Sequence, residues 1–105
     1  MNILEEAYSE LERDGIVTNQ CDFSVHWLNK SRRYFSMIRA SHDRDASLAA
    51  LSSLAANLKY HTDTCRESRL GELRQKADWL YPLTQKVWTA LYKKALTRDN
   101  PARTL

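Results

Sequence analysis

Two arginines and a serine in the middle of the chain could bond to the edges of nucleic-acid bases. Arg32 and Arg33 are adjacent and Ser36 follows about one helical turn later, so a helix would carry all three on one face. An arginine guanidinium can donate two parallel hydrogen bonds to O6 and N7 of guanine, and a serine hydroxyl can bond to several base edges. The pattern therefore predicts base contacts at these three positions.

The surrounding residues suit contacts to phosphate oxygens, which hold a protein on a duplex without reading its sequence. Residues 30–44 contain five Lys or Arg and one Asp, a local net charge of +4. The expected phosphate contacts here are Lys30, Ser31, Arg39, His42 and Arg44. A solvated helix face is the plainer interpretation of such arginines, but the density of charge favours an anionic partner.

Apolar residues at helical spacing predict the two elements that would position these groups. The first helix runs from a cap at Thr18 or Asn19 to about Leu28, and the second runs from Ser31, as N-cap, to about Ala40. This places Arg32 and Arg33 in the first turn of the second helix, as in a helix-turn-helix. The aromatic and apolar residues between could stack bases, but their spacing favours core packing: Phe23, Trp27, Tyr34, Phe35 and Ile38.

Three short motifs between residues 18 and 60 carry a family resemblance. They are Gln20-x-Asp22-Phe23-Ser24-x-x-Trp27, Phe35-x-x-Ile38 and Ser47-Leu48-x-x-Leu51-x-x-Leu54-Ala55. This segment resembles the repressor/Cro-type (lambda-repressor-like) helix-turn-helix proteins, which implies DNA binding and a phosphate contact for Gln20. Leu28-Asn29 replaces the family's turn glycine, and asparagine can adopt the left-handed conformation that glycine supplies there.

The rest of the chain also reads as helical. We expect helices over residues 2–14, ended by Gly15, and from a cap at Asp45 or Ser47 onward, with an irregular break at 62–67. A long helix follows from about Ser68 to Leu96, kinked or split near Pro82. Its heptad-like seam is Leu70, Leu73, Ala77, Leu80, Thr84, Val87 and Leu91.

Large apolar groups beside this seam exceed what one buried face needs. The seam can close the domain by packing back on the helix of residues 2–14, or it can pair with a second chain. We expect a homodimer, since a symmetric DNA site read twice gains specificity. The expected interface residues are Trp79, Leu83, Trp88, Leu91 and Tyr92.

Several classes of protein find no support in the sequence. Cys21 and Cys65 are too few for a disulfide framework and fit no metal motif, and the three histidines lack ligand spacing. The sequence shows no phosphate-binding glycine loop and no nucleophile paired with a base. No apolar run is long enough to span a membrane, and the acidic start is unlike a secretory signal. We therefore expect a cytoplasmic protein that is not an enzyme and has no cofactor, metal, membrane contact or evident small-molecule ligand.

These observations predict an all-α protein. Residues 1–61 would form a repressor-like helix-turn-helix domain, 62–98 a helical extension for packing or dimerisation, and 99–105 a flexible tail. The expected function is sequence-specific binding of double-stranded DNA by a small transcriptional regulator, with helix 31–40 in the major groove. The alternative is a helical protein-interaction module that keeps this fold without binding DNA.

Overall fold

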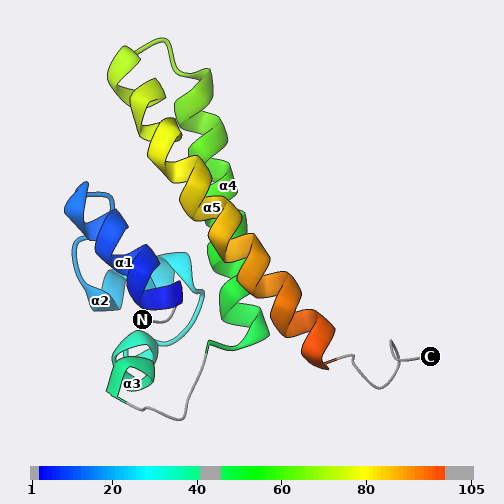
Figure 1. The fold of residues 1–105 in the computed structure, drawn as a ribbon. Helices are drawn as coiled ribbons and strands as arrows, with labels where there is room; N and C mark the ends of the chain where they lie inside the picture. The colour runs from blue at the N-terminus through cyan, green and yellow to red at the C-terminus, as the bar shows by residue number, and fades with distance from the viewer. Residues whose placement is uncertain (1–2, 41–45, 99–105) are drawn as a thin grey trace. The chain divides into compact units, whose positions relative to one another are not determined.

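The protein is all-α in the computed structural model, which describes residues 3–40 and 46–98 (Figure 1). Its contacts divide it into two units, Met1–Ser53 and Leu54–Leu105. The domain boundary expected after residue 61 falls inside a helix. No helix within the described ranges is long and apolar enough to cross a membrane.

Helix α1 (Ile3–Arg13) opens the N-terminal unit and buries one face: Leu4, Ala7, Tyr8 and Leu11. It ends as expected at Gly15, whose φ of 76° is readily available only to glycine. The N–H groups of Ile16 and Val17 both donate to the Leu11 carbonyl, which closes the end of the helix. The expected start at residue 2 lies outside the described residues.

The next helical segment begins as α2 (Gln20–Asp22) and continues as η1 (Phe23–Trp27), a π-helical turn. Asn19 is the N-cap, and its side-chain oxygen accepts the Asp22 N–H at 2.8 Å. In η1 the Leu28 N–H donates to the Phe23 carbonyl five residues back, at 3.1 Å. The sequence therefore predicted the extent of this segment but not the π-helical turn within it.

Helix α3 (Tyr34–Ala40) is shorter than expected, and the predicted start at Ser31 is wrong. The Tyr34 N–H donates to the Ser31 carbonyl at 3.1 Å, so residues 31–34 form a turn that leads into the helix. Ser31 thus takes part through its backbone carbonyl. Beneath α3 the rings of Tyr8, Phe23 and Phe35 form a cluster with centroids 4.9–5.4 Å apart.

Helix α4 (Leu48–Glu67) begins where the sequence predicted, since Ser47 Oγ accepts the Ala50 N–H at 3.1 Å. The predicted break at 62–67 is wrong, because the helix continues to Glu67. Thr62 bonds to the Leu58 carbonyl inside the helix, and Lys59 pairs with Asp63 one turn on. The chain turns at residues 68–70 instead, where Ser68 Oγ accepts the Leu70 N–H at 3.1 Å.

Helix α5 (Gly71–Arg98) is helical throughout and contains Pro82, so of the expected kink or split at this proline, the split does not occur. Pro82 is exposed, and water can bond to the carbonyl that the proline ring leaves without an N–H. The predicted seam is buried from Ala77 to Leu91, whereas Leu70 precedes the helix and is 64% exposed. In the C-terminal unit α5 runs antiparallel to α4 (Figure 1).

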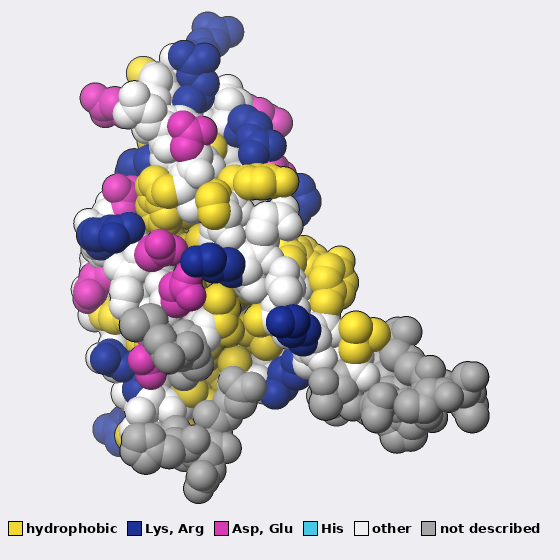
Figure 2. All heavy atoms as spheres, viewed as in Figure 1, with side chains coloured by type: hydrophobic (Ala, Val, Ile, Leu, Met, Phe, Trp, Pro, Cys, Tyr) yellow, Lys and Arg dark blue, Asp and Glu magenta, His cyan; other side chains and the backbone are white. Residues whose placement is uncertain are grey.

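Polar and apolar groups mingle on the surface of this helical pair. At the top of Figure 2, over the α4–α5 turn, Lys and Arg side chains gather with Asp and Glu among them. The charged residues of this turn are Arg66, Glu67, Arg69, Glu72, Arg74, Lys76 and Asp78. The excess of basic charge is small there, because acidic groups stand between the cations.

Candidate nucleic-acid interface

The segment that would meet DNA is anchored at its start by a small network of side chains. Asp22 Oδ2 accepts the Thr18 N–H at 3.1 Å and the Thr18 hydroxyl at 3.3 Å, while Asn19 caps the helix from the other side. Gln20, the first residue of α2, is half-buried beside this network. The side chain stands near a helix N-terminus, where backbone amides attract phosphate, although the Asp22 carboxylate opposes that attraction.

The turn between η1 and α3 adopts the conformation that the sequence predicted. Asn29 has a φ of 55°, in the left-handed region. The Leu28 side chain before it is fully buried, and the Lys30 N–H donates to the Ser24 carbonyl at 2.9 Å. The turn is therefore held from both sides although it lacks a glycine.

The first turn of α3 is capped from the neighbouring helical segment. Ser24, in η1, is fully buried, and its Oγ accepts the Phe35 N–H at 3.0 Å. An N-terminal helix amide has no partner within its own helix, so this contact satisfies a donor that would otherwise be buried and unpaired. Ser24 thereby joins the two halves of the motif, a role for which its small size was the only signal in the sequence.

The structure places the three expected base-contacting residues together on an exposed edge. Arg32 and Arg33 lie in the turn before α3 rather than in its first turn, and Ser36 follows on the helix. The Ser36 hydroxyl donates to the Arg33 carbonyl at 3.0 Å, so it offers a ligand mainly its lone pairs. No ion pair among the described residues uses either arginine.

Two further cations are held against aromatic rings. Lys30 Nζ lies 5.6 Å from the centre of the Tyr34 ring, and the Arg39 guanidinium carbon lies 5.5 Å from that of Phe35. Such contacts restrict long side chains while leaving their charge in solvent. The other two expected phosphate contacts, His42 and Arg44, lie outside the described residues.

Two exposed apolar side chains near this edge did not enter the sequence-based prediction. Met37 is 46% exposed on α3, and Val25 is 37% exposed on η1. Val25 and Arg32 line a shallow hollow together with Thr18, Asn19, Cys21, Asp22 and His26. The position of Met37 outside the Tyr34–Phe35–Ile38 stripe was the signal that could have found it. An apolar group at this edge could contact the methyl group of thymine.

Four of the five residues expected to pack behind this edge belong to the core, and the fifth, Tyr34, is half-buried. Phe23 and Phe35 are fully buried, and Trp27 and Ile38 are nearly so. Tyr8 from α1 completes the cluster, and its hydroxyl donates to Glu12 at 2.6 Å. Burial and this hydrogen bond raise the pKa of Tyr8 to about 12. The cluster gives the exposed arginines a rigid support.

The residues expected at a dimer interface separate into two groups. Leu83 and Leu91 are buried, at 1% and 8% exposure, so in this structure they belong to the packed face of α5. Trp79 and Trp88 are half-buried, and Tyr92 is 60% exposed. The heptad spacing identified a packed face but could not say which side chains remain outside it.

The structure offers no competing metal or disulfide chemistry in its described part. Both cysteines are free thiols and half-buried. The described residues contain no group of three or more His, Cys, Asp or Glu side chains that could hold a metal ion.

Comparison with known proteins places the chain in a family whose activity is not established. Neither the curated proteins nor the solved structures include a match to this sequence. A family model matches residues 4–100, which covers both structural units and nearly the whole chain. The chain therefore belongs to the family of unknown function DUF6626.

Proposed function

We propose that this protein binds double-stranded DNA through α3 and the turn before it. The observation that carries the proposal is the pair of exposed arginines, Arg32 and Arg33, on a turn fixed by Asn29 and by the Ser24 cap. A rigid support lowers the entropic cost of presenting cations to a ligand. The local charge of residues 30–44, with five basic residues and one acidic, supports the same partner.

In this proposal the side chains divide by the part of the duplex that they contact. Arg32 and Arg33 bond to guanine, Ser36 accepts from an exocyclic amine, and Met37 contacts a thymine methyl group. Lys30 and Arg39 contact phosphates, with Gln20 and Ser31 beside them. His42 and Arg44 would extend this set. The protein acts by occupying a site, as a transcriptional regulator does, and carries out no catalysis.

The decisive experiment selects bound duplexes from a random pool and then measures affinity for the selected site. Replacing Arg32 or Arg33 by Ala should cost about 1–3 kcal/mol of specific binding and relax base preference at one position. Arg69→Ala and Arg74→Ala are matched controls, because both side chains are exposed but belong to the C-terminal unit. Equal binding by wild type and the Arg32→Ala/Arg33→Ala protein would contradict base readout.

Salt dependence tests the phosphate contacts separately. Removing Lys30 or Arg39 should weaken binding to every duplex alike and should lower the slope of log K against log salt by about one unit each. The slope is measured by fluorescence anisotropy with a labelled duplex over a range of salt concentrations. A slope near zero for the wild-type protein would count against any duplex binding through this edge.

A second candidate function is protein interaction without DNA binding. The observation that favours it is a row of exposed aromatic residues on α5, where Tyr81 and Tyr92 are 47% and 60% exposed. Absence of duplex binding at low salt, with the fold intact by circular dichroism, would select this candidate.

A further inference from the structure

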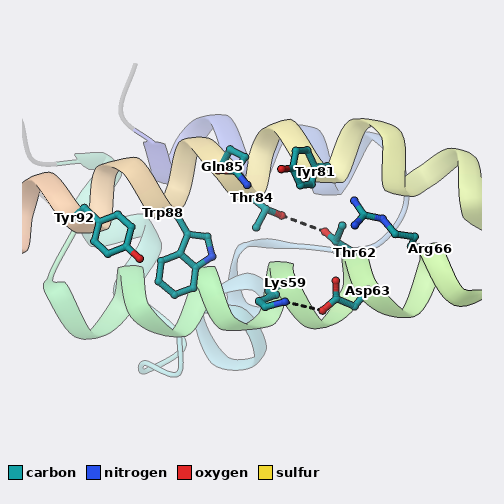
Figure 3. Close-up of a pocket in the computed structure, with 9 residues that line it drawn as sticks. All are labelled: Lys59, Thr62, Asp63, Arg66, Tyr81, Thr84, Gln85, Trp88 and Tyr92. Carbon is teal, nitrogen blue, oxygen red and sulfur yellow. Dashed lines mark hydrogen bonds and ion pairs between the residues drawn. The ribbon is translucent and has the colours of Figure 1, made fainter.

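A groove of about 340 Å³ lies between α4 and α5 in the C-terminal unit (Figure 3). Its floor is the contact between the buried hydroxyls of Thr62 and Thr84, 3.1 Å apart. One wall comes from α4 and the other from α5, and the wall residues are Lys59, Asp63, Arg66, Tyr81, Gln85, Trp88 and Tyr92. A neighbouring hollow shares Arg66 and Tyr81 and reaches Asp78 and Pro82. The hollowed surface is therefore elongated along the helices.

The α5 wall carries aromatic side chains at a spacing that places them on one face of the helix. Tyr81, Trp88 and Tyr92 stand at positions i, i+7 and i+11, so they share one face. In Figure 3 Trp88 and Tyr92 lie together toward one end of the groove, with ring centroids 5.6 Å apart, and Tyr81 lies toward the other. An aromatic stripe of this length suits a partner helix laid along the groove.

Two of the three charges of the α4 wall, Lys59 and Asp63, are arranged so that a half-turn rotation exchanges their signs. The third, Arg66, lies over the Tyr81 ring. Lys59 Nζ and Asp63 Oδ2 form an ion pair at 2.9 Å, one helical turn apart. The midpoint of this pair is level with residue 61. Since Thr62 touches Thr84 and the helices are antiparallel, residue 61 lies level with Gln85 on α5. The centre of the ion pair and Gln85 thus stand at the same height.

We propose that a second copy of this chain occupies the groove, with a two-fold axis at this height and the two α5 helices antiparallel. Such an axis places Gln85 against the partner's Gln85, where two amides can exchange hydrogen bonds. It sets Asp63 opposite the partner's Lys59, and Lys59 opposite the partner's Asp63. Trp88 then covers Tyr81 and Pro82 of the partner subunit, and Tyr92 reaches the partner's Asp78.

This register explains why the groove suits its own copy. An isologous interface must be self-complementary. The two ends of the groove differ, with the rings of Trp88 and Tyr92 at one end and Tyr81, Pro82 and Asp78 at the other. The two-fold axis places each end against the other end of the second copy. The four charges that Lys59 and Asp63 contribute in the two copies alternate in sign across the axis. The interface uses Trp88 and Tyr92 from the surface and leaves the buried Leu83 and Leu91 in the core.

The dimer goes beyond the proposed DNA binding and does not depend on it. A two-fold pair would present two copies of α3 to a symmetric site. The experiments below measure association without DNA, so failure of the dimer and failure of DNA binding are distinguishable.

Cross-linking at the axis tests the register directly. In the full chain with Cys21→Ser and Cys65→Ser, oxidation of the Gln85→Cys variant should give a covalent species of twice the 12.2 kDa chain mass on a non-reducing gel. Lys86→Cys is the matched control, since it is also exposed on α5 but does not line the groove. Equal cross-linking at both positions, or none at Gln85→Cys, would overturn the proposed axis.

A mixing experiment tests the charges across the interface. Lys59→Asp gives a groove with two carboxylates at these positions, and Asp63→Lys gives one with two ammonium groups. Each variant alone should associate several-fold more weakly than wild type in sedimentation, because like charges face each other. An equimolar mixture should recover association as a heterodimer. Recovery requires contacts between chains, since both variants lack the intrachain pair, and failure to recover would contradict the register.

Truncation of the aromatic anchor gives the largest expected loss. Trp88→Ala should weaken association by about tenfold or more if the indole is buried between copies. The competing outcome is a wild-type chain that sediments as a monomer at high concentration while Trp88→Ala lowers only thermal stability. That result would show that the groove has no second copy in it.

Discussion

The two units of this protein use their aromatic residues in opposite ways. The N-terminal unit buries Tyr8, Phe23 and Phe35 as one cluster and exposes arginines above it. The C-terminal unit fills its core mostly with Leu, Ala and Val, and it leaves Tyr81 and Tyr92 on the surface. A buried ring supports the fold, whereas an exposed ring leaves apolar surface that a partner can cover. The difference indicates that the first unit is built to hold charge in place and the second to present apolar surface.

Removing one ring from each unit gives the largest expected difference in stability between buried and exposed rings. Phe35→Ala should cost about 3–5 kcal/mol of unfolding free energy, because it leaves a cavity in the cluster. Tyr92→Ala, measured on dilute protein, should cost less than about 1 kcal/mol, because the ring is largely in solvent. Urea denaturation followed by circular dichroism gives both values. Similar losses at the two positions would remove the distinction between core and surface rings.

The buried serine of the N-terminal unit provides the next largest effect. Ser24→Ala removes the acceptor of the Phe35 N–H and leaves that amide unpaired, at a cost of about 1–3 kcal/mol. Ser36→Ala is the matched control on the exposed side of α3, and it should stay within about 0.5 kcal/mol of wild type. If Ser24→Ala lowers the unfolding free energy by less than about 0.5 kcal/mol, another group must cap α3.

The buried polar pair of the C-terminal unit should show coupling rather than a large loss. Thr62 and Thr84 each donate to a carbonyl of their own helix at 2.7 Å, and they also contact each other at 3.1 Å. Two hydroxyl protons cannot fill three bonds at once, so the contact between the helices competes with the other two. Thr62→Val and Thr84→Val should each cost about 1 kcal/mol, and the double variant should cost less than their sum. Strict additivity in the double-mutant cycle would show that the pair does not interact.

High pH should affect the N-terminal unit through Tyr8. The folded-state pKa of Tyr8 is raised from 10.0 to about 12, first by burial and then by the bond to Glu12. A raised pKa means that this contribution to stability is complete below pH 10 and is lost as pH rises toward 12. Denaturation at several alkaline pH values should show a steeper loss for wild type than for Tyr8→Phe, which has no phenol to ionise. Parallel curves would contradict the shift.

The C-terminal unit should respond at the opposite end of the pH scale. Burial lowers the pKa of His61 below its ordinary 6.5. The unfolded chain then binds a proton more readily than the folded one, so stability present above pH 6.5 falls as the solution becomes more acidic. His61→Gln should flatten the acid limb of the stability profile and leave the alkaline limb unchanged.

Local signals predicted local structure well. Asn29 in the left-handed region, Gly15 at the end of α1 and Ser47 as the cap of α4 were all expected and are confirmed. Each depends on one residue's own conformational freedom or on a bond to an amide three residues away. The all-helical fold was also predicted, because periodic apolar faces and few Gly or Pro residues leave little room for strands.

Two predictions from the sequence differ from the structure. One depended on a contact between residues distant along the chain, and the other on which side of a helix a residue occupies. The threonines and aspartate at 62–67 suggested a break, but Thr62 contacts Thr84, 22 residues further along the chain, and the helix continues to Glu67. Pro82 suggested a kink or a split, and the helix is not split, because Pro82 lies on the exposed side of α5, where a missing hydrogen bond is tolerated.

The sequence by itself determined the helical class, most of the caps and the cluster of basic residues at 30–44, because these follow from residue type and short-range spacing. Only the tertiary structure decided that α3 starts at Tyr34. The Phe35 N–H in its first turn is capped by the side chain of Ser24, which lies eleven residues earlier in the chain. It also decided that Leu83 is buried while Tyr92 is exposed. A heptad pattern shows that a helix has an apolar side, but the width of that side and the part that a neighbouring helix covers depend on how the helices pack.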